Sequence, residues 1–220
     1  MHISESTIKL LNNFAKINQN LMLNEGNLLK TVNVEKTVIA VAHIEDSFDE
    51  SYGIYDLSEF LNTIGMFNDP ELEFHGDVLT ISDSSDGNIQ TKYYAANPEV
   101  LTKVPDMKEI PSGEETFTLS SKNFKRLERG GNTLKLNALF FEAKNGILTA
   151  SVQDKDGKNK NLVSVGLTDK YSGEDFSVHI SLHKMTILDG DYECSIHGNR
   201  ILVMKNTERD LTYVIAIDVE

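Results

Sequence analysis

Apolar residues are spaced as in helices in three segments of the chain. From Ser4 to Asn18 they recur every three or four positions, which predicts an amphipathic helix with Ser4 as its N-cap. The same spacing returns from Asp56 to Phe67 and from Ser120 to Arg129, where Gly130 and Gly131 are expected to end the helix. A short fourth helix is predicted from Leu182 to Leu188.

Strands are predicted where β-branched and aromatic residues gather between turn residues. In the first half, the strand candidates are Leu28 to Val34, Thr37 to Ile44, Glu71 to Phe74, Val78 to Ser82 and Asn88 to Tyr94. In the second half, they are Thr116 to Leu119, Leu134 to Ala143, Ile147 to Gln153, Leu162 to Leu167, Phe176 to Ile180, Tyr192 to His197, Arg200 to Met204 and Leu211 to Val219. Glycine-containing turns such as Asn145-Gly146 join neighbouring strands, which indicates antiparallel hairpins. The pattern as a whole predicts an α+β fold.

A proline-rich stretch divides the chain. Three of the four prolines, Pro98, Pro105 and Pro111, fall within residues 98–115 among charged residues, which is typical of an extended linker. We therefore expect an N-terminal domain of residues 1–97, an interdomain linker of residues 98–115 and a C-terminal domain of residues 116–220.

The two halves repeat the same order of elements. At an offset of 122 residues, His75-Gly76 matches His197-Gly198, and Leu79 to Ile81 matches Ile201 to Val203. Matching turns, strand spacing and element order together favour duplication of one domain over two unrelated α+β halves.

Composition places the chain among ordinary globular proteins. Of its 220 residues, 40% are apolar and 25% are charged, and no apolar run is long enough to span a membrane. The first residues lack the pattern of a signal peptide, so a cytoplasmic protein with no membrane partner is expected. The single cysteine, Cys194, excludes an internal disulfide and a thiolate cluster within one chain.

The charge of the chain is strongly negative but unevenly distributed. Its 21 basic and 34 acidic side chains give a net charge of −13, and a uniform surface of that sign would repel nucleic-acid phosphates. Four basic residues nevertheless fall within residues 120–129, against Glu128 alone, and two lysines fall within residues 4–18, against Glu5 alone. Basic groups are thus concentrated on two predicted helices, either as solvated faces or as surfaces for an anionic partner.

The chain contains no pattern typical of a catalytic, metal or cofactor site. The six histidines are dispersed, and the segment Asp154 to Gly157 begins like a calcium loop but lacks the remaining ligands, so a hairpin turn is expected there. No catalytic residue, metal ligand or cofactor is therefore predicted. An enzyme built from converging carboxylates such as Asp46, Asp49 and Glu50 is a weaker alternative, which would require a deep cleft.

Four short stretches carry a resemblance to a known family. They are Leu10 to Asn18 followed by Leu21 to Leu23, then Ile54 to Leu57 with Phe60-Leu61, Gly190 to Tyr192, and Tyr213 to Ala216. With the element order and the length, these stretches make the sequence similar to the sliding clamps of T-even-type bacteriophages, the processivity factors of their DNA polymerases.

The resemblance implies a ring and a mechanism without catalysis. It implies a homotrimer of subunits with two similar clamp domains, each with antiparallel sheets outside and two helices on the inner face. Twelve helices spaced about 10 Å apart would leave an opening of roughly 28 Å, wide enough for duplex DNA. The ring would encircle DNA without sequence preference and tether the replicative polymerase. The residues then expected to face DNA are Lys9, Lys16, Lys122, Lys125, Arg126, Arg129 and, more weakly, Lys184.

The resemblance also implies protein partners. Clamps of this family bind peptides of the polymerase and of a clamp-loader ATPase in apolar pockets on the outer face, and late-transcription factors are further partners. The candidate partner-binding residues beside the linker are Val100, Leu101, Val104, Met107 and Ile110. The same residues fit a linker pinned to the domain body equally well. The alternative function is a duplicated β-rich structural protein of a virion with no role in encircling DNA.

Overall fold

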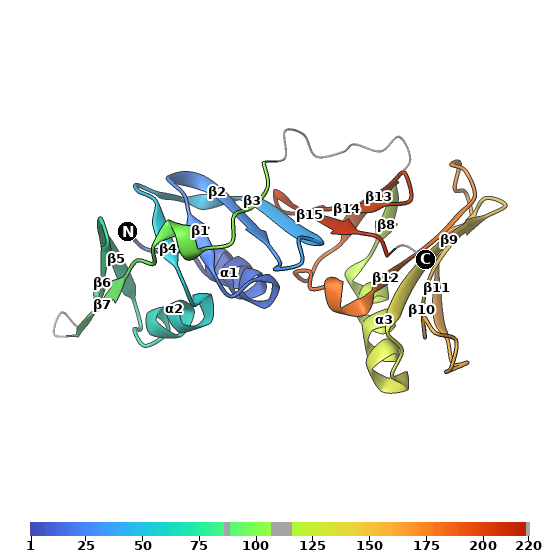
Figure 1. Ribbon diagram of the computed structural model, residues 1–220, viewed down its shortest axis with the longest axis horizontal. Coiled ribbons are helices and arrows are strands. Elements are labelled where there is room, and N and C mark those ends of the chain that lie inside the picture. Colours follow the sequence, from blue (N-terminus) through green and yellow to red (C-terminus); the bar gives the residue numbers. More distant parts are fainter. Residues whose placement is uncertain (86–88, 107–115, 219–220) are drawn as a thin grey trace. The chain divides into compact units, whose positions relative to one another are not determined.

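The structure, a computed structural model, describes residues 1–85, 89–106 and 116–218. It divides into two compact units, Met1–Asp106 and Met107–Glu220, and each combines antiparallel sheets with few helices (Figure 1). The predicted α+β class is therefore confirmed. None of the helices in the described ranges is long and apolar enough to cross a membrane.

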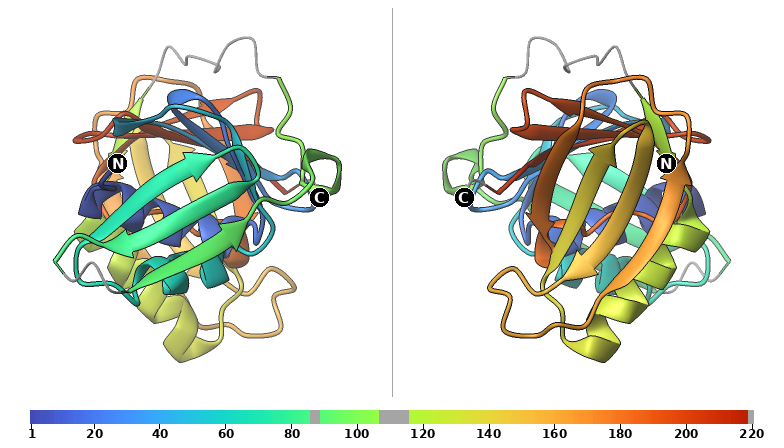
Figure 2. Two further views of the ribbon diagram at one scale, coloured as in Figure 1. Left: turned by 90° about the vertical axis from the view of Figure 1, so that its left-hand side faces the viewer. Right: turned by 90° about the vertical axis from the view of Figure 1, so that its right-hand side faces the viewer.

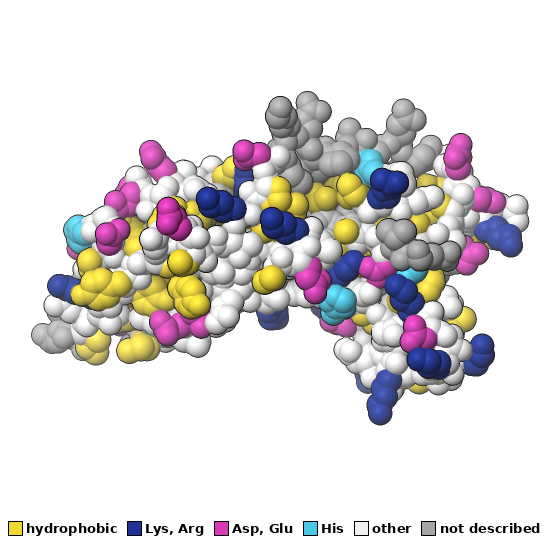
Figure 3. Space-filling view, in the orientation of Figure 1, with side chains coloured by type: hydrophobic (Ala, Val, Ile, Leu, Met, Phe, Trp, Pro, Cys, Tyr) yellow, Lys and Arg dark blue, Asp and Glu magenta, His cyan; other side chains and the backbone are white. Residues whose placement is uncertain are grey.

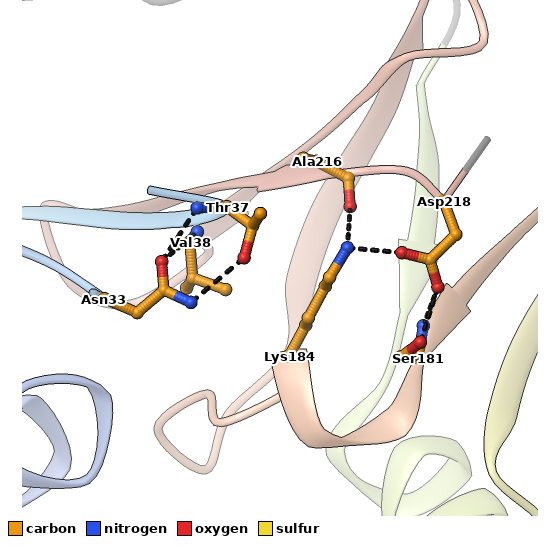
Figure 4. A network of polar contacts seen from close by, with 7 residues as sticks. All are labelled: Asn33, Thr37, Val38, Ser181, Lys184, Ala216 and Asp218. Atoms are coloured by element: carbon orange, nitrogen blue, oxygen red, sulfur yellow. Dashed lines mark hydrogen bonds and ion pairs between the residues drawn. The ribbon is translucent and has the colours of Figure 1, made fainter. Parts of the chain in front are cut away.

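The first unit begins with a helix and ends with a small sheet. Its elements are α1 (Glu5–Ile17), β1 (Leu21–Leu23), β2 (Gly26–Val32), β3 (Val38–Phe48), β4 (Tyr52–Ile54), α2 (Leu57–Ile64), β5 (Pro70–His75), β6 (Val78–Asp83), β7 (Gln90–Tyr94) and the 3-10 turn η1 (Pro98–Val100). Strand β1 pairs with β4, β2 with β3, and β6 lies between β5 and β7, always antiparallel. The turn between β2 and β3 is closed by Asn33, whose side chain accepts hydrogen bonds from the backbone N–H groups of Thr37 and Val38 (Figure 4).

The second unit repeats this order. Its elements are β8 (Phe117–Leu119), α3 (Ser121–Leu134), β9 (Ala138–Lys144), β10 (Ile147–Gln153), β11 (Val163–Thr168), β12 (Phe176–Ser181), the 3-10 turn η2 (Leu182–Lys184), β13 (Tyr192–His197), β14 (Ile201–Asn206) and β15 (Leu211–Ala216). One sheet has the strand order β11-β10-β9-β12, and β8, β13, β14 and β15 are paired in sequence (Figure 2).

The units have corresponding pairings as well as corresponding elements. In both, the first and fourth strands after the long helix pair with each other, as do the second and third. The ungapped offset of 122 is wrong beyond the turn, because His75 pairs with Val78 across a two-residue turn whereas His197 pairs with Ile201 across three residues. The similarity of the two halves is thus confirmed, with one inserted residue in the second.

The long helices form because one side of each packs onto strands. In α1, the buried residues Leu10, Leu11 and Phe14 recur at helical spacing, and Ser4 caps the first turn by accepting a hydrogen bond from the Thr7 N–H group at 3.2 Å. Full burial of a side chain such as Phe14 contributes about 1.5–3 kcal/mol to folding. Helix α2 ends at Ile64 rather than Phe67, and it buries Leu57, Phe60, Leu61 and Ile64 in the same way.

Helix α3 extends beyond its predicted end. Gly130 and Gly131 lie inside the helix, which continues to Leu134 and ends at Lys135 in the left-handed conformation. A Cβ atom on Gly130 would lie 2.7 Å from a methyl group of Val163 on β11, and one on Gly131 would lie 2.6 Å from Leu182. The glycines therefore allow close packing of α3 against its neighbours instead of ending the helix.

The predicted helix from Leu182 to Leu188 is reduced to the 3-10 turn η2. Its Lys184 side chain is only 9% exposed and donates hydrogen bonds to the Asp218 carboxylate and to the Ala216 carbonyl (Figure 4). Ser181 donates to the other Asp218 oxygen from its N–H group at 2.8 Å and from its hydroxyl at 2.6 Å. Burial raises the pKa of Asp218, but the hydrogen bonds from Lys184 and Ser181 outweigh burial and lower the pKa to about 2.

The Lys184–Asp218 pair should make the stability of the chain sensitive to acid. Because its folded-state pKa lies below the unfolded value of 3.8, Asp218 stabilises the fold above pH 4 and loses this effect as the pH falls toward 2. We expect Lys184→Ala to lower the free energy of unfolding by about 3 kcal/mol at pH 7, because it leaves a poorly solvated carboxylate unpaired. In denaturant titrations, the stability difference between the wild type and Asp218→Asn should shrink between pH 5 and pH 2; a constant difference would contradict this account.

Candidate nucleic-acid interface and partner pocket

The exposed side of α1 carries Lys9 and Lys16. Asn12 lies between them on the same face, and Glu5 begins it. The start of the helix is held by Asp46, whose carboxylate accepts hydrogen bonds from the Ser4 N–H group at 3.0 Å and from the Ser4 hydroxyl at 2.7 Å. The face is therefore fixed by packing on one side and by a tertiary cap at its end.

Helix α3 exposes a continuous basic face. Lys122, Lys125, Arg126 and Arg129 follow one another at positions i, i+3, i+4 and i+7, and all four are exposed. Leu127 and Gly131 on the opposite side are buried. Because residues with this spacing share one side of a helix, the four cations form a single surface about 10 Å long. Figure 3 shows dark-blue side chains gathered where α3 lies.

Acidic side chains contact two of the predicted DNA-facing lysines. Lys125 donates to Asp189 at 2.5 Å, and Lys9 lies 3.7 Å from Glu5. Asp189 also accepts a hydrogen bond from the Ser121 hydroxyl, and the donors Lys125 and Ser121 hold the pKa of Asp189 below its ordinary value. Both pairs are largely exposed, so each contributes little to stability. The sequence did not indicate Asp189, which is 64 residues from Lys125.

Lys184 does not belong to the basic surface. Its ammonium group is buried in an ion pair with the Asp218 carboxylate, so it is not available to bind an anion in solution. Helix α2 carries no basic residue. The structure thus leaves six of the seven predicted cations exposed, two on α1 and four on α3.

A pocket in the first unit includes two of the predicted partner-binding residues. Its volume is about 380 Å³, and it lies between the segment of residues 98–106 and the strands β1 and β2. Leu101 and Val104 line it from the segment, and Leu21, Met22 and Val32 from the strands. Its polar lining includes Lys30, Lys103 and Thr31, whose buried hydroxyl oxygen has no hydrogen-bond partner in the described part of the chain.

The segment beside the pocket is pinned to the first unit. Leu101 is 7% exposed and packs against Gly53, and the Thr102 N–H group donates to the Asn20 side chain at 2.8 Å. Val100, by contrast, is 58% exposed and does not line the pocket. Met107 and Ile110, the other predicted residues of this group, lie outside the described residues.

Two of the three carboxylates proposed as a catalytic alternative, Asp46 and Glu50, accept structural hydrogen bonds. Burial raises the pKa of Asp46, but hydrogen bonds from Thr7 and Ser4 outweigh burial and bring the pKa below its ordinary value. The carboxylate therefore stays ionised. Glu50 accepts a hydrogen bond from the Gly76 N–H group in the turn between β5 and β6. Among the described residues, no three His, Cys, Asp or Glu side chains are grouped to hold a metal ion.

Comparison with known sequences gives phage relatives. A family model described as DNA polymerase processivity factor matches residues 4–96. The sliding clamp of Vibrio phage KVP40 is 29% identical over 202 residues, which cover 90% of each chain. The sliding clamps of Escherichia phage RB69 and Enterobacteria phage T4 are 26% and 28% identical, and the alignments cover 100% and 88% of this chain and 98% and 86% of theirs.

Solved clamp structures have the same fold. PCNA from A. fulgidus, solved with the C-terminal region of FEN-1, gives a TM-score of 0.71 at 14% identity and covers 97% of this chain and 95% of its own. PCNA from Thermococcus kodakaraensis gives 0.69 at 15% identity, with 99% and 98% covered. Together with the sequence relatives, this fold confirms the predicted resemblance: the chain has the fold of a sliding clamp and is similar over most of its length to the sliding clamps of T4-like phages.

Proposed function

We propose that three copies of the chain form a closed ring around duplex DNA, with the exposed faces of α1 and α3 toward the phosphates. The observation that carries this proposal is the basic face of α3, four cations at helical spacing in a chain of net charge −13. An acidic exterior would discourage DNA from binding elsewhere, whereas six exposed cations per subunit would attract it to the helices. The virion-protein alternative gives no reason for this separation of charge.

Retention on DNA would come from topology rather than from tight contacts. A closed ring cannot leave a duplex sideways, so each phosphate contact can be weak and screened by salt. The acids beside Lys9 and Lys125 fit this requirement, because each reduces the attraction of one lysine for phosphate. The ring would therefore slide without sequence preference.

We propose that the ring closes through β7 of one subunit and β11 of the next. In the described part of the chain, each of these strands pairs on one side only, and they are the two strands with no buried residue. Tyr94 on β7 is 68% exposed, and Val163, Val165 and Leu167 of β11 are only partly covered. Pairing the two edges would satisfy their backbone groups and cover this apolar surface.

The pocket of the first unit would bind peptide segments of protein partners. Its mixed lining of Leu101, Val104, Lys30 and Lys103 fits a peptide that combines apolar and acidic side chains. The similar A. fulgidus PCNA was solved with the C-terminal region of FEN-1 bound, so a clamp of this fold binds a segment of another protein. The replicative polymerase, a clamp-loader ATPase and late-transcription factors are the partners proposed for this chain.

We propose further that the chain is not an enzyme and acts in the host bacterial cytoplasm. The structural roles of Asp46 and Glu50 support the first statement, and the phage relatives support the second. Ring opening would then depend on the partner ATPase.

The oligomeric state tests the ring. Light scattering at micromolar concentration should give about three times the chain mass of 24.6 kDa, because a head-to-tail contact that closes stops at a fixed number of copies. On dilution the mass should fall directly toward that of one chain. A stable monomer or an open-ended series of larger species would contradict the closed ring.

The basic face of α3 can be tested with a charge-matched control. Replacing Lys122, Arg126 and Arg129 with Ala should lower polymerase processivity on a primed circle, and the loss should grow as salt is raised. The control replaces Lys144, Lys170 and Lys205, which are exposed on strands and turns of the same unit. Each lost phosphate contact should reduce the slope of log K against log[salt] for duplex binding by about one. Equal losses in both triple variants would remove α3 from the DNA-facing surface.

The pocket can be tested with two valines of the same segment. Val104→Glu places a charge in the pocket lining and should reduce binding of a clamp-binding peptide of the polymerase at least tenfold, because an apolar contact is replaced by a buried charge. Val100→Glu, at an exposed position outside the lining, should leave peptide binding unchanged. Calorimetry of the two trimers would measure both, and equal affinities would place the peptide elsewhere.

A further inference from the structure

A lysine-rich loop lies at the end of α3. It comprises residues 154–162 between β10 and β11, and is called the lysine loop below. Lys155, Lys158 and Lys160 in this loop are exposed, as is Lys135 directly after α3. The same loop contains two acidic residues, Asp154 and Asp156, so basic residues outnumber acidic ones here. Figure 2 shows the loop and the last turn of α3 at the same end of the second unit.

The conformation of the loop is determined by its uncharged and acidic side chains. The Asp154 carboxylate accepts hydrogen bonds from the Asn159 N–H group at 2.8 Å and from the Asn137 side chain at 3.2 Å. Gly157 provides the positive φ of the turn, at 66°. Since Asp154 is occupied within the turn, its charge is directed at the backbone, and the hydrogen bond from Asn159 keeps its pKa low. The lysines are left to point outward.

The lysine loop is also attached to α3. Asn159 donates a hydrogen bond of 2.8 Å to the Leu134 carbonyl, one of the helix-end carbonyls that has no partner within the helix. The Lys155 N–H group donates to the Asn137 side chain at 2.8 Å. These hydrogen bonds hold the backbone of the loop beside the end of α3, so its exposed lysines lie beyond the basic face of the helix. Lys135 itself has φ 55°, a conformation more often taken by glycine at a helix end.

We propose that the lysine loop and Lys135 form a second contact surface for the phosphates of duplex DNA, at the rim of the ring where the duplex leaves the opening. This inference rests on the proposed DNA-facing role of α3. From Lys122 to Lys135 the helix rises about 20 Å, so the loop extends the line of cations beyond the helix to the end of the opening. Charge complementarity favours phosphates as the occupant, because one acid of the loop is held in the turn and the other, Asp156, lies 3.1 Å from Lys158 in an exposed pair that water weakens. The ring would consequently hold the duplex more strongly at one rim than at the other.

A pair of double variants of the full-length trimer tests the proposal. Lys155→Gln with Lys160→Gln removes two charges from the lysine loop. The matched control, Lys144→Gln with Lys170→Gln, removes two exposed charges from the opposite end of the same sheet, at the end of β9 and just after β11. Binding to a short linear duplex, whose free ends let a ring thread without a loader, is followed by fluorescence anisotropy between 20 and 200 mM salt. Thermal unfolding of both variants checks that the fold is retained.

The loop variant should bind more weakly at low salt, and the slope of log K against log[salt] should become shallower by about one to two. The control should leave the slope unchanged. Equal slopes in both variants, or a loop variant that binds DNA normally but fails to stimulate the polymerase, would overturn the proposal; the second outcome would assign the loop to a protein partner. The α3 triple variant separates this failure from a failure of the proposed function: if it binds as tightly as the wild type, α3 itself does not face DNA.

Discussion

The packing of each long helix onto strands decides which side chains are available to a partner. In α3 this constraint is strongest at Gly130, where Val163 of β11 comes so close that no side chain fits. With that side closed, Lys122, Lys125, Arg126 and Arg129 have only the solvent side. The basic surface is thus a consequence of core packing, and its position cannot change without loss of the fold.

The parts of the fold that depend on local pattern were predicted from the sequence. Helix α1 agrees with its prediction to within one residue at each end, because its apolar spacing and its Ser4 cap are local features. The predicted end of α3 is wrong because Gly130 and Gly131 do not stop the helix; they pack closely against Val163 of β11 and Leu182 of η2. The short strands β1 and β4 were missed as strands, since three residues carry too little pattern.

The candidate site was predicted in outline for the same reason. Spacing alone placed four cations on one side of α3. It could not place Lys184, because the burial of its side chain depends on an ion pair with Asp218, 34 residues away in the sequence. Nor could it indicate that Asp189 contacts Lys125, or that Leu101 packs against Gly53 and lines a pocket together with Val104. Interactions between residues far apart in sequence leave no periodic signal, so they require the folded chain.

The contact between Lys125 and Asp189 bears on how freely such a ring would travel. When the ring slides, a lysine breaks its contact with one phosphate before it contacts the next. Between the two contacts its ammonium group has no anionic partner, and this raises the energy of the intermediate position. Asp189 is an alternative ion-pair partner for Lys125 in that position, so the ammonium group can exchange between the carboxylate and a phosphate. With the ring around DNA, this exchange would lower the energy barriers between successive phosphate contacts. An acidic residue next to a DNA-facing lysine would thus make sliding faster.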